Sequence, residues 1–393
     1  MEQVNPAVIV WARETAGLSP EEAGKALSLG GKRLSGAEAL LQYETGAKAP
    51  TRPLLLKMAK TYHRPLLTFY LAQPPRIGDR GEDFRTLPEE RRVEDKGTLD
   101  ALVRDLYVRQ RLVSEALEDA EEADPRGYVG ALSIDLPIES FAQKVVEILG
   151  FDLGAFRQKR TIEDSFTYAR GLAERAGVFV LLTGNLGSHH SNVSTEVFRG
   201  FALSDKIAPF IAINDQDAKS AWTFTLLHEM AHICLGESGI SGSYAEQRTE
   251  KYCNDIASQI LLPKQELANF EPRAKDLEEF VVLVGDFARQ RKISSAMVTY
   301  RLWQKGSISK ENWQQATERF RELWKADKDQ QKLKQKSAGK TGPDYYTVKR
   351  HKAGAALVNL VRRGVDEGVL TPTKAGRVLG VSPGNVASMV GTR

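Results

Sequence analysis

The chain has 393 residues, more than one hydrophobic core usually spans, so two or three domains are expected. Its 41% hydrophobic and 27% charged residues are ordinary for a globular protein and exclude wholesale disorder. Because no run approaches eighteen apolar residues and no signal peptide begins the chain, the sequence predicts a cytoplasmic protein without membrane contact. Two cysteines, Cys234 and Cys253, cannot build a disulfide framework or a thiolate metal cluster. Any metal must therefore be held by histidines and carboxylates.

Residues 1–75 are expected to form a bundle of short helices. Ser19 and Glu22 form a capping box with Pro20 at the first helical position, which is typical of a helix N-terminus. The second and third helices are joined by a Gly30-Gly31 turn, as in a helix-turn-helix DNA-binding unit. The predicted helices are Pro6–Ala16, Pro20–Leu27, Ser35–Tyr43, Leu54–Tyr62 and Pro65–Leu71.

The segment LLQYETGAKAPTRPLLLKMAKTYHRPLLTFYL resembles the end of an XRE-type helix-turn-helix domain. The resemblance implies that Ser35–Gln42 is the recognition helix, and duplex DNA is then a partner. The candidate DNA contacts are Lys32, Arg33, Ser35 and Gln42. Glu38 on the same helix would repel phosphate, so a domain for homodimer formation or protein contact is the alternative.

The middle of the chain changes from helices to strands and back. A linker over residues 76–98 is followed by predicted helices over Leu99–Glu122, Pro137–Leu149 and Ser165–Ala176. Three strands are expected at Val178–Leu182, Phe198–Leu203 and Pro209–Asn214, and the last two are expected to form a hairpin. Helices dominate again from Ala221. The fold class is therefore mainly α with a small β-sheet, an α+β fold.

The most informative residues are His228-Glu229-Met230-Ala231-His232, within a stretch of helical spacing. Histidines four residues apart lie one turn apart on one helix face, so both imidazoles can reach a single zinc ion. Glu229 lies beside them, placed to accept a proton from metal-bound water. Because zinc accepts neutral imidazoles and keeps one position open for water, Zn²⁺ is the expected cofactor.

A third protein ligand is expected on a carboxylate beyond His232. Glu250 is preferred to Glu246, one turn earlier, and to Glu237, but spacing separates these three only weakly. Asn254 lies one turn after Glu250 and is expected to support a ligand histidine by a hydrogen bond.

The block FRGFALSDKIAPFIAINDQDAKSAWTFTLLHEMAHICLG, followed by a motif of the form ExxCNxxAxxxLLP, resembles the ImmA/IrrE family of zinc metallopeptidases. The resemblance implies a zincin-like domain, expected here over residues 99–320, in which Glu250 is the third ligand and Glu229 the general base. It also implies cleavage of a repressor- or antitoxin-type partner protein. The alternative is a DNA-binding transcriptional regulator or antitoxin whose zinc domain has little or no proteolytic turnover.

Zinc peptidases commonly bind substrate as a strand added to a sheet edge, and either FRGFAL or PFIAIN would supply that edge. An oxyanion donor is also needed. Its candidates, among which the sequence does not choose, are Tyr244, Tyr252, His189 and His190.

The C-terminal region, residues 321–393, is expected to be a basic helical domain with fifteen Lys/Arg and six Asp/Glu. A helix is predicted from about Lys352 to Gly368, then helices over Thr371–Leu379 and Ser382–Met389 across a tight Gly-Val turn. This outline fits a second nucleic-acid module or a helical cap on the peptidase domain, and the cap is slightly preferred.

Overall fold

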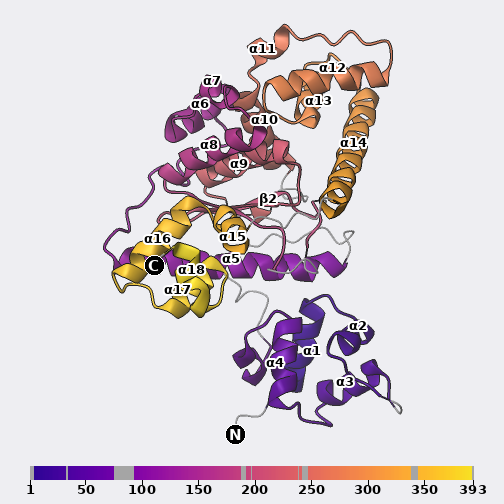
Figure 1. The fold of residues 1–393 in the computed structure, drawn as a ribbon, viewed down its shortest axis with the longest axis vertical. Helices are drawn as coiled ribbons and strands as arrows, with labels where there is room; N and C mark the ends of the chain where they lie inside the picture. Colours follow the sequence, from indigo (N-terminus) through magenta and orange to yellow (C-terminus); the bar gives the residue numbers. More distant parts are fainter. Residues whose placement is uncertain are drawn as a thin grey trace. The chain divides into compact units, whose positions relative to one another are not determined.

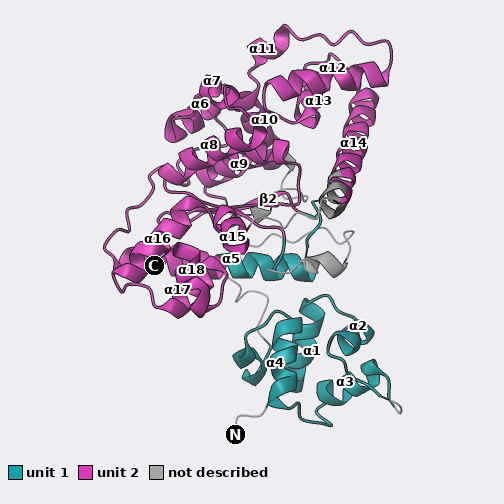
Figure 2. Cartoon of the chain, viewed as in Figure 1, with its two compact units in different colours: residues 1–106, 185–197 teal, residues 107–184, 198–393 magenta. Residues whose placement is uncertain are grey.

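The computed structural model describes residues 4–31, 34–74, 93–186, 192–195, 197–237, 239–240, 247–337 and 344–391. The chain divides into two compact units, one of residues 1–106 and 185–197 and one of residues 107–184 and 198–393 (Figure 2). Most described residues are helical and one small sheet is present (Figure 1), so the predicted α+β class is confirmed. None of the described helices is long and apolar enough to cross a membrane.

The first unit begins with short helices that bury one shared core. They are α1 (Pro6–Thr15), α2 (Pro20–Ala26), α3 (Gly36–Glu44), α4 (Arg52–Thr61) and the 3₁₀ helix η1 (Leu66–Tyr70). The predicted Ser19–Glu22 capping box is present. The backbones of helices α2 and α3 contact each other directly at Gly24 and Gly36. A Cβ on Gly24 would lie only 2.5 Å from the carbonyl carbon of Gly36, so this contact requires glycine. The expected final helix is a 3₁₀ helix rather than an α-helix.

Two long helices cross expected domain limits. Helix α5 (Val93–Asp119) begins inside the expected linker of residues 76–98. Helix α14 (Lys310–Ser337) runs through the expected boundary between residues 320 and 321 without a break. The second unit therefore continues into the C-terminal region through regular helix.

Most of the second unit between residues 138 and 304 is helical. Its helices there are α6 (Ile138–Leu149), α7 (Leu153–Arg157), α8 (Ile162–Arg175), α9 (Lys219–Leu235), α10 (Gln247–Leu261), α11 (Lys264–Ala268), α12 (Leu277–Gln290) and α13 (Ser295–Gln304). Helix α9 lies against strands β2 (Gly200–Leu203) and β3 (Phe210–Ile213) and packs between α8 and α10 (Figure 1). Its apolar residues Leu226, Leu227, Met230 and Ile233 are fully buried, which fixes the helix in the core.

The sheet has the strand order β1-β3-β2-β4. Its strands are β1 (Phe179–Leu182), β2 (Gly200–Leu203), β3 (Phe210–Ile213) and β4 (Gly239–Ile240). The predicted β2–β3 hairpin is confirmed as an antiparallel pair, with Gly200 opposite Ile213. Strand β3 also pairs in parallel with β1, so it lies inside the sheet. Strand β2 lies between β3 and β4. The expectation that FRGFAL or PFIAIN would supply a substrate-binding edge is therefore wrong, because each strand has a neighbour on both sides.

The C-terminal segment forms α15 (Tyr345–Ala353), α16 (Ala355–Asp366), α17 (Pro372–Leu379), the 3₁₀ helix η4 (Pro383–Asn385) and α18 (Val386–Val390). The single helix expected from Lys352 to Gly368 is wrong, because Gly354 breaks it with a φ of +89°. A Cβ at Gly354 would lie 2.4 Å from Oε1 of Glu174, so only glycine fits this junction.

A buried charge pair attaches this segment to the sheet. The Arg170 guanidinium on α8, only 6% exposed, donates hydrogen bonds to the carbonyl of Val180 in β1. It also donates to the carbonyls of His351, at 2.5 Å, and Lys352, at 3.1 Å. Glu174 lies 3.3 Å from the Arg170 Nε. The segment thus packs on helix α8 and strand β1 of the second unit.

Candidate metal centre

Helix α9 places the two histidines of the motif side by side in the core. His228 and His232 lie one turn apart, and their Nε2 atoms are 3.1 Å from each other. Both are buried, with 4% and 7% of their surfaces exposed. The helix ends at Gly236, whose φ of +76° closes it one turn after His232.

Glu250, in the first turn of α10, completes a three-residue group with these histidines. Its Oε2 lies 3.3 Å from Nε2 of His228, and its Oε1 lies 3.3 Å from Nε2 of His232. Burial raises the pKa of this carboxyl, but hydrogen bonds from the two imidazoles lower it to about 2. The structure therefore brings together the ligand set that the sequence predicts, while Glu246 lies outside the described residues.

The donor set fits a zinc ion. Ligand atoms held about 2.1 Å from a tetrahedral zinc lie about 3.4 Å apart. Here the two imidazole Nε2 atoms lie 3.1 Å apart, and each lies 3.3 Å from a different carboxylate oxygen of Glu250. Two imidazole nitrogens and one carboxylate oxygen also leave a fourth position for a non-protein ligand, which is the pattern of catalytic zinc sites.

Glu229 lies beside the donor group and against strand β2. It is fully buried, and a Cβ built on Gly200 would lie 2.9 Å from its Oε1 and 2.4 Å from Cγ2 of Thr225. Strand β2 can pass this close to α9 only because residue 200 lacks a side chain. The backbone of β2 thus forms one wall around the carboxylate that the sequence predicts to be the general base.

The second nitrogen of His232 has supporting contacts that differ from the predicted one. Its Nδ1 lies 3.4 Å from Oε2 of Glu237, in the loop after α9. Burial lowers the pKa of His232, but hydrogen bonds with Cys253, Glu237 and Glu250 hold it well above its ordinary value. Asn254 is half-buried on α10, and within the described chain its side chain makes no hydrogen bond to either histidine. Glu237, one of the three carboxylates considered as the third ligand, instead contacts Nδ1 of the ligand His232.

We expect Glu237→Ala to weaken zinc binding by about 10- to 100-fold, the usual effect of removing the hydrogen-bond partner of a ligand histidine. Competition with a chromophoric chelator measures this affinity. Glu237→Gln keeps an acceptor oxygen and should weaken zinc binding less, and Glu147→Ala on α6 is a control far along the chain. Wild-type affinity in Glu237→Ala would contradict the supporting role, and a loss as large as that of His232→Ala would make Glu237 a ligand.

Of the four predicted oxyanion donors, the structure describes only Tyr252. The Tyr252 hydroxyl donates a hydrogen bond to the Leu136 carbonyl at 2.6 Å, so in this structure it is not available to an oxyanion. The remaining oxyanion candidates, Tyr244, His189 and His190, lie outside the described residues.

In the first unit, the predicted DNA contacts are only partly described. Ser35 caps α3, its Oγ accepting the backbone N–H of Glu38, and Gln42 is half-buried. Lys32 and Arg33 lie outside the described residues. Leu41, 56% exposed, and Leu34, 42% exposed, lie in and just before the same helix. DNA contact by this unit stays a prediction.

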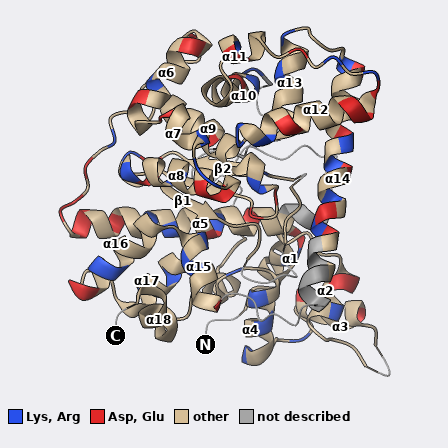
Figure 3. Ribbon diagram, turned by 45° about the horizontal axis from the view of Figure 1, so that its top comes forward, with Lys and Arg blue, Asp and Glu red and all other residues tan. Residues whose placement is uncertain are grey.

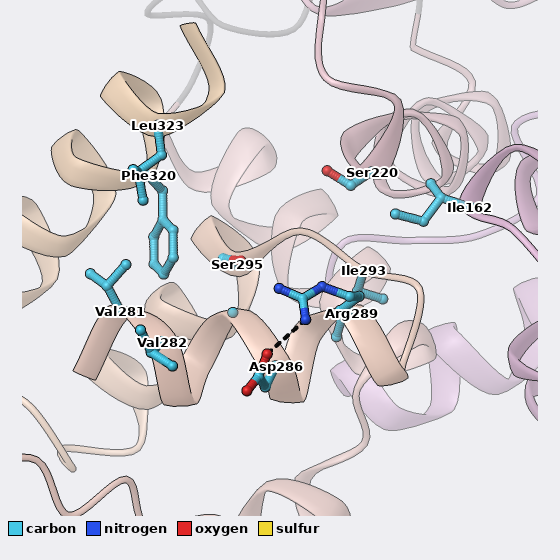
Figure 4. Close-up of a pocket in the computed structure, with 11 residues that line it drawn as sticks. Ile162, Ser220, Val281, Val282, Asp286, Arg289, Ile293, Ser295, Phe320 and Leu323 are labelled. Atoms are coloured by element: carbon cyan, nitrogen blue, oxygen red, sulfur yellow. Dashed lines mark hydrogen bonds and ion pairs between the residues drawn. The ribbon is translucent and has the colours of Figure 1, made fainter. Parts of the chain in front are cut away.

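A pocket of about 360 Å³ lies elsewhere in the second unit (Figure 4). Val281, Val282 and Phe320 are among its apolar side chains, and an ion pair of 2.7 Å joins Asp286 to Arg289 beside them. None of the four candidate site residues is among those that line it. The pocket is therefore separate from the metal centre.

Comparison with known proteins agrees with this geometry. No curated protein and no solved structure is similar enough to the chain to count as a match. Residues 173–302, however, match the family model described as the IrrE N-terminal-like domain, which is a peptidase family. This range includes His228, Glu229, His232 and Glu250. Residues 173–302 are therefore similar to an IrrE N-terminal-like domain of the peptidase type.

Proposed function

We propose that the protein is a zinc-dependent endopeptidase. The observation that carries the proposal is the convergence of His228, His232 and Glu250 next to Glu229, inside the region that matches a peptidase family. A purely structural zinc site would have no use for a buried carboxylate beside its ligands.

Each residue has one task in this proposal. His228, His232 and Glu250 hold the ion, and Glu237 fixes the tautomer of His232 by accepting a hydrogen bond at Nδ1. When bound, zinc supplies a Lewis acid that polarises a peptide carbonyl and makes water more acidic. Glu229 accepts a proton from the attacking water at its carboxylate and later donates it to the departing amine.

The proposed substrate is a partner protein of the repressor or antitoxin type. The support for this class is the resemblance of residues 1–75 to an XRE-type regulatory domain together with the peptidase-family match. In this scheme the first unit recruits or senses the partner and the second unit cleaves it.

A second candidate is a DNA-binding regulator or antitoxin whose zinc domain turns over little substrate. The complete burial of Glu229 favours it, because the water and the departing amine that exchange a proton with a general base must both reach this carboxylate. The two candidates differ in whether the loaded protein cleaves peptide bonds at all.

The test is a cleavage screen with a proteome-derived peptide library, read by mass spectrometry of new N-termini. Zinc-loaded wild type should generate new N-termini, and Glu229→Gln and chelator-treated wild type should not. Absence of cleavage by a wild-type protein that carries one zinc per chain would refute the peptidase proposal and favour the second candidate.

A further inference from the structure

The end of the chain has the geometry of a helix-turn-helix. Helix α17 is capped by Thr371, whose Oγ1 accepts the backbone N–H of Lys374. It ends at Leu379, and residues 380–382 form the turn before the helical stretch of η4 and α18 begins at Pro383. Helix α16 packs against both. In helix-turn-helix modules, two helices are joined by a short turn and both pack against a third helix, as here.

Glycines make this tight turn possible. Gly380 has a φ of +67°, a conformation that side-chain-bearing residues rarely adopt. A Cβ on Gly376 would lie 2.8 Å from the carbonyl oxygen of Val381, so α17 packs directly on the turn backbone. In the first unit, by contrast, the connection between α2 and α3 covers residues 27–35 and is much longer.

The outward face of the last helical stretch is small and neutral. Its apolar residues Val386, Met389 and Val390 are buried. Its exposed residues are Pro383, Gly384, Asn385, Ala387 and Ser388. No large apolar side chain is exposed in the described α16, α17 or α18, unlike Leu34 and Leu41 in the first unit. Such a face suits close approach of a polar surface better than an apolar protein interface.

Cationic groups surround this face. Lys374 and Arg377 are exposed on α17, which carries no acidic residue, and neither does α18 (Figure 3). The Arg350 guanidinium donates a hydrogen bond to the Ser388 carbonyl at 3.1 Å. A Cβ on Gly380 would lie 2.6 Å from Nη2 of Arg109, so that guanidinium lies against the turn. Residues 344–391 together hold seven Lys/Arg and three Asp/Glu.

From this fold and charge, we propose that α17, the turn and α18 form a binding site for duplex DNA. Lys374 and Arg377 contact phosphates, and Asn385 and Ser388 face the groove. The segment contacts Arg170 at the junction of α15 and α16. The proposed DNA-binding site on α17 and α18 therefore uses a different surface of the segment. The inference does not depend on proteolysis.

Fluorescence anisotropy with a labelled 30-base-pair duplex of random sequence tests this site, with the full chain carrying Glu229→Gln so that no cleavage interferes. Ala387→Glu places a carboxylate on the exposed face and should weaken binding at least ten-fold. Lys374→Ala should weaken binding and lower the slope of log affinity against log salt by about one, the value of one phosphate contact. Ala326→Glu, on an exposed position of α14, is the matched control and should bind as the parent does.

Any of three results would overturn the proposal. One is absence of binding by the parent at low salt. Another is binding that survives Ala387→Glu but is lost in Lys32→Ala/Arg33→Ala, which would assign DNA contact to the first unit. If Ala387→Glu leaves DNA binding intact and changes the sedimentation of the protein, the face is an interface between copies of the chain and the DNA site is refuted. Circular dichroism of each variant excludes unfolding as the cause of a loss.

Discussion

Glu229→Gln is expected to lower kcat for peptide cleavage by about 10²- to 10⁴-fold, the range that general acid–base catalysis contributes. The amide is nearly the same size as the carboxylate but cannot accept a proton from water. Because Glu229 is not one of the three residues whose donor atoms converge, zinc content should stay at the wild-type level. Steady-state kinetics and metal analysis of the same preparation measure both quantities.

Glu147→Gln, at a half-exposed position of α6, is the control and should match wild type in both measurements. Activity of Glu229→Gln within a few-fold of wild type would contradict the role of this carboxylate as the base. Loss of zinc together with activity would show that Glu229 holds the site together rather than moving a proton.

Arg170→Met is expected to lower the free energy of unfolding of the second unit by about 3–5 kcal/mol, since it leaves the buried Glu174 carboxylate without its counter-charge. The change also removes the donors to Val180 in β1 and to the end of α15. Urea unfolding followed by circular dichroism measures the loss.

Arg363→Met is the matched control, because Arg363 also joins the C-terminal segment to the rest of the unit. Its ion pair with Glu122 is 2.7 Å long but half-exposed, so its removal should cost about 0–1 kcal/mol. Replacing both buried partners, in Arg170→Met/Glu174→Leu, should recover much of the lost stability. Equal effects of the two single variants would contradict the assignment of Arg170 as the main attachment.

The local features that the sequence predicted well depend on neighbouring residues. The Ser19–Glu22 capping box and the helix that carries His228 and His232 follow from short-range rules, and the structure has them. The β2–β3 hairpin follows from two apolar runs separated by a short turn.

The features that the sequence did not predict depend on tertiary contacts. Strand β3 lies inside the sheet because β1, some thirty residues earlier, pairs with its other side, and no local pattern encodes that pairing. The C-terminal helix breaks at Gly354, where φ is +89°, and only glycine fits there because Glu174 and Val180 occupy the space of a side chain. The contact between Glu237 and His232 depends on how the loop after α9 turns, which spacing does not specify.

The most direct test of the metal centre is the zinc content of the purified full-length protein, wild type beside His228→Ala and Glu250→Gln. We expect one zinc per wild-type chain, and little or none in either variant, because each removes one of three protein ligands. Lys264→Ala, at an exposed position near α10, should retain one zinc. A wild-type protein that carries no zinc and takes none up on addition would contradict the proposed metal centre and the peptidase function built on it.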